Sequence, residues 1–249
     1  MSDVYSTPQS NLTPERSGDR RWGSLEDGVN GNYHFRVGEL ISEAWERTSG
    51  AKLTIILAGI VYFAVMFGVS LVMGFVIGIV GPDSGGAAVV LAILNQVVVT
   101  AVSLPLGMGL FMLGLKRSVD APLNVGEVFN YFHKALPLLL TAILMYVMLF
   151  IGFLLLVLPG IYLMFSYYLA LPLVIEKNLS PWQALEASRK AVTKRWFAVF
   201  GLFLLLGLIN FVAMIPLGIG LIWTIPMTMI CYGALYRNVF GVEDQTMAG

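Results

Sequence analysis

The chain has 249 residues, of which 57% are hydrophobic and 12% are charged, and its mean hydropathy is +0.80. These values are typical of polytopic membrane proteins and exclude an ordinary soluble globular domain. The formal net charge of zero hides a strong segregation, because the charged residues are confined to short segments between long apolar runs.

The N-terminal part differs in composition from the rest. Residues 1–33 are rich in Ser, Asn, Gly, Asp and Arg and show no helical periodicity, which predicts a disordered cytoplasmic tail. In residues 36–48, apolar side chains recur at the spacing of one helical face, which predicts an amphipathic surface helix. The first long apolar run begins at Leu53, after a leader that contains acidic residues, so we expect no cleavable signal peptide.

Three long blocks that are almost free of charge fill most of the remaining chain. Each block is long enough for two transmembrane helices, because one span needs about 20 residues. Prolines near the middle of each block mark the turns. The predicted spans are residues 53–80, 87–115, 135–158, 161–175, 196–215 and 217–236. The fourth span is short and contains Pro172, and a re-entrant segment is the alternative there.

The six predicted spans belong to one domain, residues 34–240, which is followed by a short polar tail at residues 241–249. Three units of this domain share a pattern, in which a surface helix precedes an apolar run that is broken at a proline. The second surface helix is expected at residues 124–134, with Asn124 and Glu127 as its capping pair. The prolines are Pro82, Pro159 and Pro216. We therefore predict an all-α membrane protein whose six transmembrane helices form three parallel repeats of amphipathic surface helix plus transmembrane hairpin.

The third surface helix carries the densest group of basic residues. Ser180 and Gln183 form a predicted capping pair around Pro181, and a charged helix follows. Its apolar residues fall near one face, a composition typical of a helix that lies on a membrane. The candidate contacts to anionic lipid headgroups are Arg189, Lys190, Lys194 and Arg195. A protein docking patch is the alternative reading of this group.

The distribution of basic residues predicts the orientation of the chain. All 15 Lys and Arg residues precede the first span, follow the last one, or lie in the segments that join one predicted hairpin to the next. None lies in a turn within a hairpin. By the positive-inside rule, we expect both termini of this multi-pass protein to be cytoplasmic.

Few residues in the predicted spans could do chemistry. None of the spans contains an acid or base, which argues against a proton relay or an ion-coupled pump. Asn95, Gln96 and Asn210 are the candidate intramembrane polar contacts, and they either form hydrogen bonds between helices or line a substrate path. His34 and His133 lie in separate segments, which favours packing over metal binding. We predict no catalytic, cofactor or metal site.

Three stretches carry a resemblance to a known family. They are residues 169–202, the sequence FRVGELISEAW at residues 35–45, and the turn at residues 158–162. Over about residues 35–240, the chain resembles uncharacterised six-helix proteins of the bacterial inner membrane, a family related to the membrane domain fused to some glycerophosphodiester phosphodiesterases. The resemblance implies a bacterial inner-membrane location and six helices. It brings no activity, since no phosphodiesterase domain is present.

Together these observations predict a non-enzymatic integral membrane protein that organises or regulates the cell envelope. The alternative is an uncoupled transporter or channel for a small molecule or lipid, and an intramembrane enzyme ranks third. We expect membrane lipids with anionic headgroups as partners at the cytoplasmic face. A protein partner or a homo-oligomer remains open, and neither a cofactor nor a nucleic acid is expected.

Overall fold

The computed structural model describes residues 22–80 and 85–248, and every regular element in these two ranges is helical. The first elements are α1 (Leu25–Asn30), α2 (Val37–Thr48), α3 (Lys52–Val80), α4 (Gly86–Ser118) and the 3-10 turns η1 (Val125–Phe129) and η2 (Phe132–Lys134). The later elements are α5 (Ala135–Leu155), α6 (Val157–Ser166), α7 (Ala170–Glu176), α8 (Pro181–Lys194), α9 (Trp196–Met214), α10 (Leu221–Phe240) and α11 (Asp244–Ala248).

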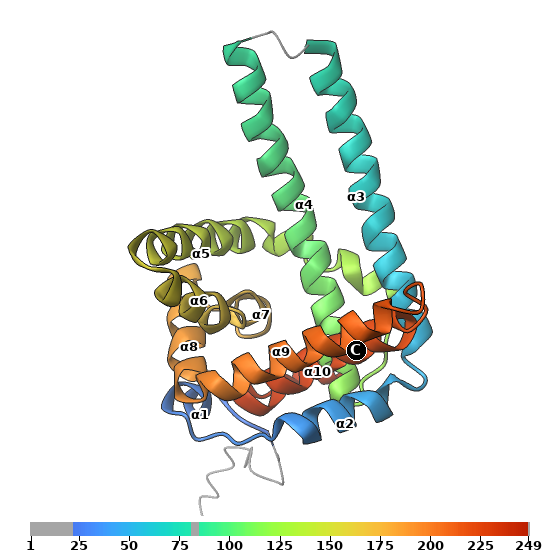
Figure 1. Cartoon of the computed structure of the whole chain (residues 1–249), viewed down its shortest axis with the longest axis vertical. Helices are drawn as coiled ribbons and strands as arrows, with labels where there is room; N and C mark the ends of the chain where they lie inside the picture. The colour runs from blue at the N-terminus through green and yellow to red at the C-terminus, as the bar shows by residue number, and fades with distance from the viewer. Residues whose placement is uncertain (1–21, 81–84, 249) are drawn as a thin grey trace, which may run out of the picture.

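A long hairpin of α3 and α4 projects from a body formed by the other helices (Figure 1). The described part of the hairpin carries no charge between Leu53 and Leu115, and its projecting side chains are exposed. Phe63 and Phe75, for example, are each 71% exposed. Such a surface is stable in lipid rather than in water. α4 continues without a break through Pro105.

Within the described ranges, five helical stretches are long and apolar enough to cross a membrane. They are Lys52–Ile79, Gly86–Ser118, Val125–Leu155, Val157–Glu176 and Trp196–Met214. The chain is therefore an all-helical protein with the composition of a multi-pass membrane protein. The predicted count of six is not confirmed, because α10, which contains Arg237, is not among the five.

α10 lies across the base of the hairpin instead of running along it (Figure 1). It packs against α4 and α2, and two glycines make the closest approach possible. A Cβ atom at Gly114 of α4 would collide with the carbonyl oxygen of Met229, and a Cβ atom at Gly233 of α10 would collide with the backbone of α4. The crossing thus depends on two positions that have no side chain.

The turn before α10 lies beside the base of the hairpin. Gly218, Leu221 and Ile225 line an apolar crevice together with Ile55 and Phe63, which belong to the half of α3 nearest Lys52. Lys52 places its ammonium 4.7 Å from the ring centroid of Trp223. The sequence predicts this turn at the far end of a membrane-spanning hairpin, whereas the structure places it beside the first turns of α3. The arrangement of three similar repeats is therefore not confirmed.

The predicted span over residues 161–175 is split in two. The helix break falls at Leu156, in extended backbone, and not at Pro159-Gly160 as predicted. Pro159 is the third residue of α6, where a proline is tolerated because its missing N–H group would have no partner within the helix. α6 ends at Ser166 and α7 begins at Ala170, so the candidate span Val157–Glu176 consists of two helices joined by a short turn rather than one unbroken helix.

The second predicted surface helix is also shorter than expected. Residues 124–134 form two 3-10 turns, η1 and η2, rather than an α-helix. The predicted cap is confirmed, because the backbone N–H of Asn124 donates to Glu127 Oε1 at 3.1 Å and the N–H of Gly126 donates to Asn124 Oδ1 at 2.8 Å. A cap of this kind starts a helical turn but does not determine how far the helix continues.

The predicted N-terminal tail needs correction. Residues 22–33 are ordered, since they contain α1 and a buried Tyr33 whose hydroxyl donates to the carbonyl of Ala191 at 2.9 Å. Burial raises the pKa of Tyr33 to about 12, against the opposing charge of Arg195. Residues 1–21 of the predicted tail lie outside the described residues. At the other end, the predicted short tail contains α11, and the hydroxyl of Thr246 in this helix donates to Glu176.

Replacement of Gly114 by Ala should separate α4 from α10, because the added methyl group meets backbone atoms that cannot rotate away. We expect a loss of about 1 to 3 kcal/mol in the free energy of unfolding, as is usual for overpacking in a close contact. Gly107→Ala is the matched control, because a Cβ atom there has nothing within 4 Å. Thermal melting in detergent measures both, and equal melting temperatures would contradict the close crossing.

Candidate functional site

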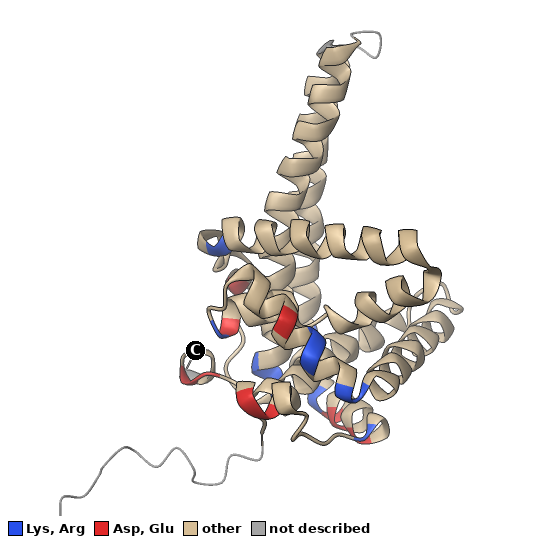
Figure 2. Cartoon of the chain, turned by 90° about the vertical axis from the view of Figure 1, so that its left-hand side faces the viewer, with Lys and Arg blue, Asp and Glu red and all other residues tan. Residues whose placement is uncertain are grey.

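Among the described residues, the Lys, Arg, Asp and Glu side chains lie in the body and at the base of the hairpin, and none lies between Leu53 and Leu115 (Figure 2). The most buried of these groups is Arg237 of α10, which is 5% exposed. Its guanidinium donates to Glu43 in a two-pronged contact, at 2.7 Å to Oε1 and 2.9 Å to Oε2. It also donates to the carbonyl oxygen of Ser118. A single side chain therefore ties α10 to α2 and α4.

The same contact extends to the connection after α4. Arg47 pairs with Glu43 at 2.9 Å and with Asp120, and Arg117 donates to the carbonyl oxygens of Arg47 at 2.7 Å and of Ser49 at 2.8 Å. Burial works to raise the pKa of Glu43, but the hydrogen bonds and charges of the two arginines outweigh it, and the pKa is lowered. Glu43 is thus held as a carboxylate. We call Glu43, Arg47, Arg117, Asp120 and Arg237 the base cluster.

A second group of charged residues surrounds a polar cavity of about 370 Å³ between η2, α7 and the C-terminal segment. Its most buried cation, Lys116, lies 3.0 Å from Glu127. Lys134 donates to the amide oxygen of Asn178 across the cavity wall. The remaining polar lining residues are Asn130, Tyr131, His133, Glu176, Glu243, Gln245 and Thr246.

Glu176 fixes the C-terminal segment over this polar cavity. Its two carboxylate oxygens accept hydrogen bonds from the backbone N–H of Glu243 and from the hydroxyl of Thr246, each at 2.6 Å. The ammonium of Lys177 pairs with Glu243, also at 2.6 Å. The chain end therefore forms one wall of the cavity. Sequence reasoning missed this site, and the only local signal was the Glu176-Lys177 pair at the end of an apolar run.

The third surface helix, α8, begins as predicted but faces a different neighbour. Pro181 is its first residue, and the N–H of Ser180 donates to Gln183 Oε1 at 3.2 Å. Its apolar side packs on the protein rather than on lipid, since Leu185 and Val192 are at most 2% exposed. Trp182, another apolar residue of this helix, is 58% exposed. The outer face of α8, and not its apolar stripe, is what remains free to meet a membrane.

Two of the four predicted headgroup contacts are occupied within the protein. Arg189 makes a two-pronged contact with Glu186 at 2.8 and 2.9 Å, which lowers the pKa of that carboxyl. The guanidinium of Arg195 lies 2.8 Å from His34 Nδ1 and over the ring of Tyr33.

The other two are more open. Lys190 is half exposed and lies 3.4 Å from Glu186, a carboxylate that Arg189 already engages. Lys194 is exposed and has no ion pair within the described part of the chain. Lys190 and Lys194 are thus the two basic side chains of α8 that an external anion could reach.

The three predicted intramembrane amides do not form one site. Asn210 of α9 donates to Thr228 of α10 at 2.9 Å, so it joins two helices as one of the two predicted roles requires. Gln96 is exposed and donates to Thr100 of its own helix at 3.1 Å, and Asn95 beside it is partly exposed. The structure does not bring these two together with Asn210.

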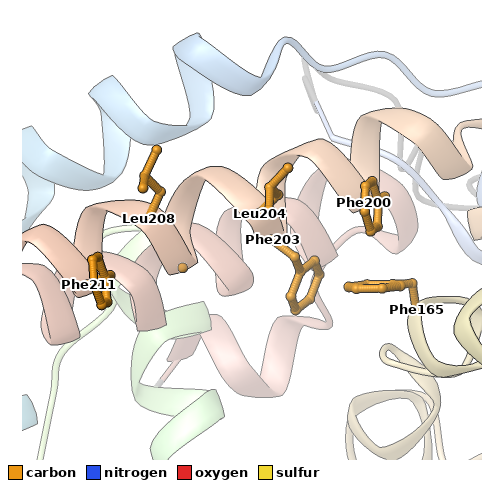
Figure 3. Close-up of a pocket in the computed structure, with 7 residues that line it drawn as sticks. Phe165, Phe200, Phe203, Leu204, Leu208 and Phe211 are labelled. Atoms are coloured by element: carbon orange, nitrogen blue, oxygen red, sulfur yellow. The ribbon is translucent and has the colours of Figure 1, made fainter.

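An apolar crevice of about 480 Å³ lies beside α9 (Figure 3). We call it the aromatic groove. Its lining residues come from α9, except for one from α6, and they are Phe165, Phe200, Phe203, Leu204, Gly207, Leu208 and Phe211. The ring of Phe165 meets those of Phe200 and Phe203 edge-on, with centroids 5.1 and 5.3 Å apart. Such a lining suits an alkyl chain and gives a polar ligand no partner.

Among residues 22–80 and 85–248, no three His, Cys, Asp or Glu side chains come together in a way that could hold a metal ion. The nitrogen Nδ1 of His133 lies 2.8 Å from the carbonyl oxygen of Asn130, and His34 contacts Arg195. The lining of the polar cavity allows recognition by charge and hydrogen bonding, and that of the aromatic groove allows recognition by apolar contact.

Arg237→Gln should leave Glu43 partly buried without its main partner. We expect a loss of about 3 kcal/mol in the free energy of unfolding, the low end for a broken buried pair because Glu43 is 28% exposed. The control is Arg36→Gln, which removes an exposed pair with Glu39 and should cost at most about 1 kcal/mol. Melting in detergent compares them, and similar losses would mean that the base cluster contributes no more than a surface pair.

No family model matches the chain, and neither a curated protein nor a solved structure matches it.

Proposed function

We propose that this protein is a non-enzymatic, multi-pass protein of the bacterial inner membrane that organises or regulates the cell envelope. The observation that carries the proposal is the placement of α8. Its inner face is packed on the body, while Trp182, Lys190 and Lys194 are exposed on its outer face. Indole rings and lysines are the side chains that suit the interface between lipid and water.

The orientation and helix count form part of the same proposal. We place both termini in the cytoplasm, because all 15 basic residues lie outside the turns within the predicted hairpins. We also propose α10 as a sixth membrane-embedded helix, since the pairing of Arg237 with Glu43 reduces the cost of an arginine near the interface. The sequence pattern of three repeats and the resemblance to six-helix inner-membrane proteins support this count.

The alternative is an uncoupled transporter or channel, and the polar cavity is the observation that favours it. A cavity of about 370 Å³ lined by Lys116, Lys134 and Glu176 has the size and polarity to hold a small solute. It lies at the charged end of the molecule, and the described hairpin continues from there without a charged residue. We therefore rank this function second.

Cysteine labelling tests the orientation in a Cys231→Ala background. A cysteine at Ser84, which the sequence places between the first two predicted spans, should react with an impermeant thiol reagent added outside intact cells. A cysteine at Asn178, between α7 and α8, should react only after the membrane is opened, since it lies on the side that carries the basic residues. Labelling of Asn178→Cys in intact cells would reverse the proposed orientation.

A deletion strain tests the function itself. We expect loss of the protein to make the envelope more permeable to an impermeant dye, and the wild-type gene to restore the normal permeability.

Asn210→Leu removes the hydrogen bond to Thr228 and should cost at most about 2 kcal/mol of stability, with function lost only as folded protein is lost.

Gln96→Leu is the matched control, because Gln96 bonds only within its own helix, and it should behave as wild type. An intact envelope combined with an altered profile of accumulated solutes in the deletion strain would favour the transporter.

A further inference from the structure

The aromatic groove continues into a ring cluster at the N-terminal end of α9. Trp196 stacks on Phe200 with ring centroids 5.1 Å apart and meets Phe165 edge-on at 6.0 Å. Its indole N–H donates to the carbonyl oxygen of Tyr162 at 3.1 Å. This bond satisfies the polar edge of the indole, so the ring can close one end of an apolar groove without leaving an unpaired donor.

The same end of the groove adjoins the basic turn of α8. Only Arg195 separates Lys194 from Trp196 in the chain, and the hydroxyl of Tyr162 is bonded to Thr193. The aromatic cluster at the end of the groove is therefore close in the chain to Lys194, whose stem packs on Gly31, and Lys190 lies one helical turn earlier on α8. A phospholipid with a negative headgroup carries its acyl chains and its phosphate in the same order. The acyl chain corresponds to the apolar groove and the phosphate to the lysines.

The middle of the groove has room for a chain. A Cβ atom at Gly207 would have nothing within 4 Å, so this glycine leaves part of the α9 surface open. The neighbouring Leu204 and Leu208 are exposed, at 63% and 56%. In a bilayer these side chains would be covered by acyl chains, and the lysines decide which kind of lipid supplies the chain.

We infer that the chain binds one anionic phospholipid specifically, with an acyl chain in the aromatic groove and the phosphate beside Lys190 and Lys194. The inference rests on the proposed function, because it names the lipid that the outer face of α8 meets. A zwitterionic lipid offers the groove the same acyl chain, but its net charge of zero gains less from the two lysines.

Native mass spectrometry of the full-length protein tests the site. Delipidated protein in detergent is titrated with dioleoylphosphatidylglycerol or with dioleoylphosphatidylcholine, which share their acyl chains. We expect one saturable adduct with the anionic lipid. Gly207→Leu should fill the groove and weaken that adduct about tenfold. Gly68→Leu is the matched control, an exposed glycine of α3 that also has open space around it, and it should bind as wild type.

The headgroup contact is tested by charge. Lys190→Gln and Lys194→Gln should each weaken binding of the anionic lipid about fivefold and leave binding of the zwitterionic lipid unchanged. Arg36→Gln removes an exposed cation of α2 and should change neither. Because both lysines are at the surface, their variants should fold normally, which a melting curve checks.

Three results would overturn the inference. They are equal affinity for the two lipids, equal binding by Gly207→Leu and Gly68→Leu, and a dimer that excludes lipid from the groove. None of them bears on the permeability of the deletion strain, so the proposed function can stand when the lipid site fails. Conversely, a deletion strain with an intact envelope would reject the function even if the lipid binds.

Discussion

The buried pair between Arg237 and Glu43 is the interaction on which the rest of the structure depends. An arginine that is 5% exposed is tolerated only when its charge and its N–H groups are satisfied, and Glu43 with the carbonyl of Ser118 meets that need. The partners come from three helices, so the requirement of one side chain fixes where α2, α4 and α10 meet. The glycines at the crossing then allow the backbones to approach closely. The turn before α10 consequently lies beside the first turns of α3.

Features encoded by near neighbours in the chain could be predicted from the sequence. The long helices α3 and α4, the cap at Asn124 and Glu127 and the start of α8 at Pro181 all depend on composition or on contacts within three residues. The break at Leu156 could not be predicted in the same way, because an apolar residue gives no local signal. Pro159 gives a strong signal, yet it falls in the first turn of α6, where a proline starts a helix as readily as it ends one.

The candidate site was predicted less well, because periodicity shows that a helix has an apolar face but not what covers it. Leu185 and Val192 give α8 the pattern of a membrane-surface helix, and the same pattern serves to pack it on the body. The four predicted headgroup contacts differ in their availability for a similar reason. Arg189 has an acid three residues earlier, which the sequence displays, while Arg195 meets His34, which is distant in the chain. The polar cavity joins residues from η2, α7 and the chain end, so only the fold reveals it.

The length of the projecting hairpin has a consequence for the surrounding bilayer. α3 has 29 residues, which at about 1.5 Å each is roughly 43 Å, against a hydrocarbon thickness of about 30 Å. Such hydrophobic mismatch is relieved when the helix tilts or when the adjacent lipids stretch to meet it. The free-energy cost of stretching lipids is smaller when two neighbouring proteins share the same stretched lipids. Proteins with similarly long helices therefore gather where the bilayer is already thick. The hairpin can therefore influence which proteins become its neighbours without contacting any of them.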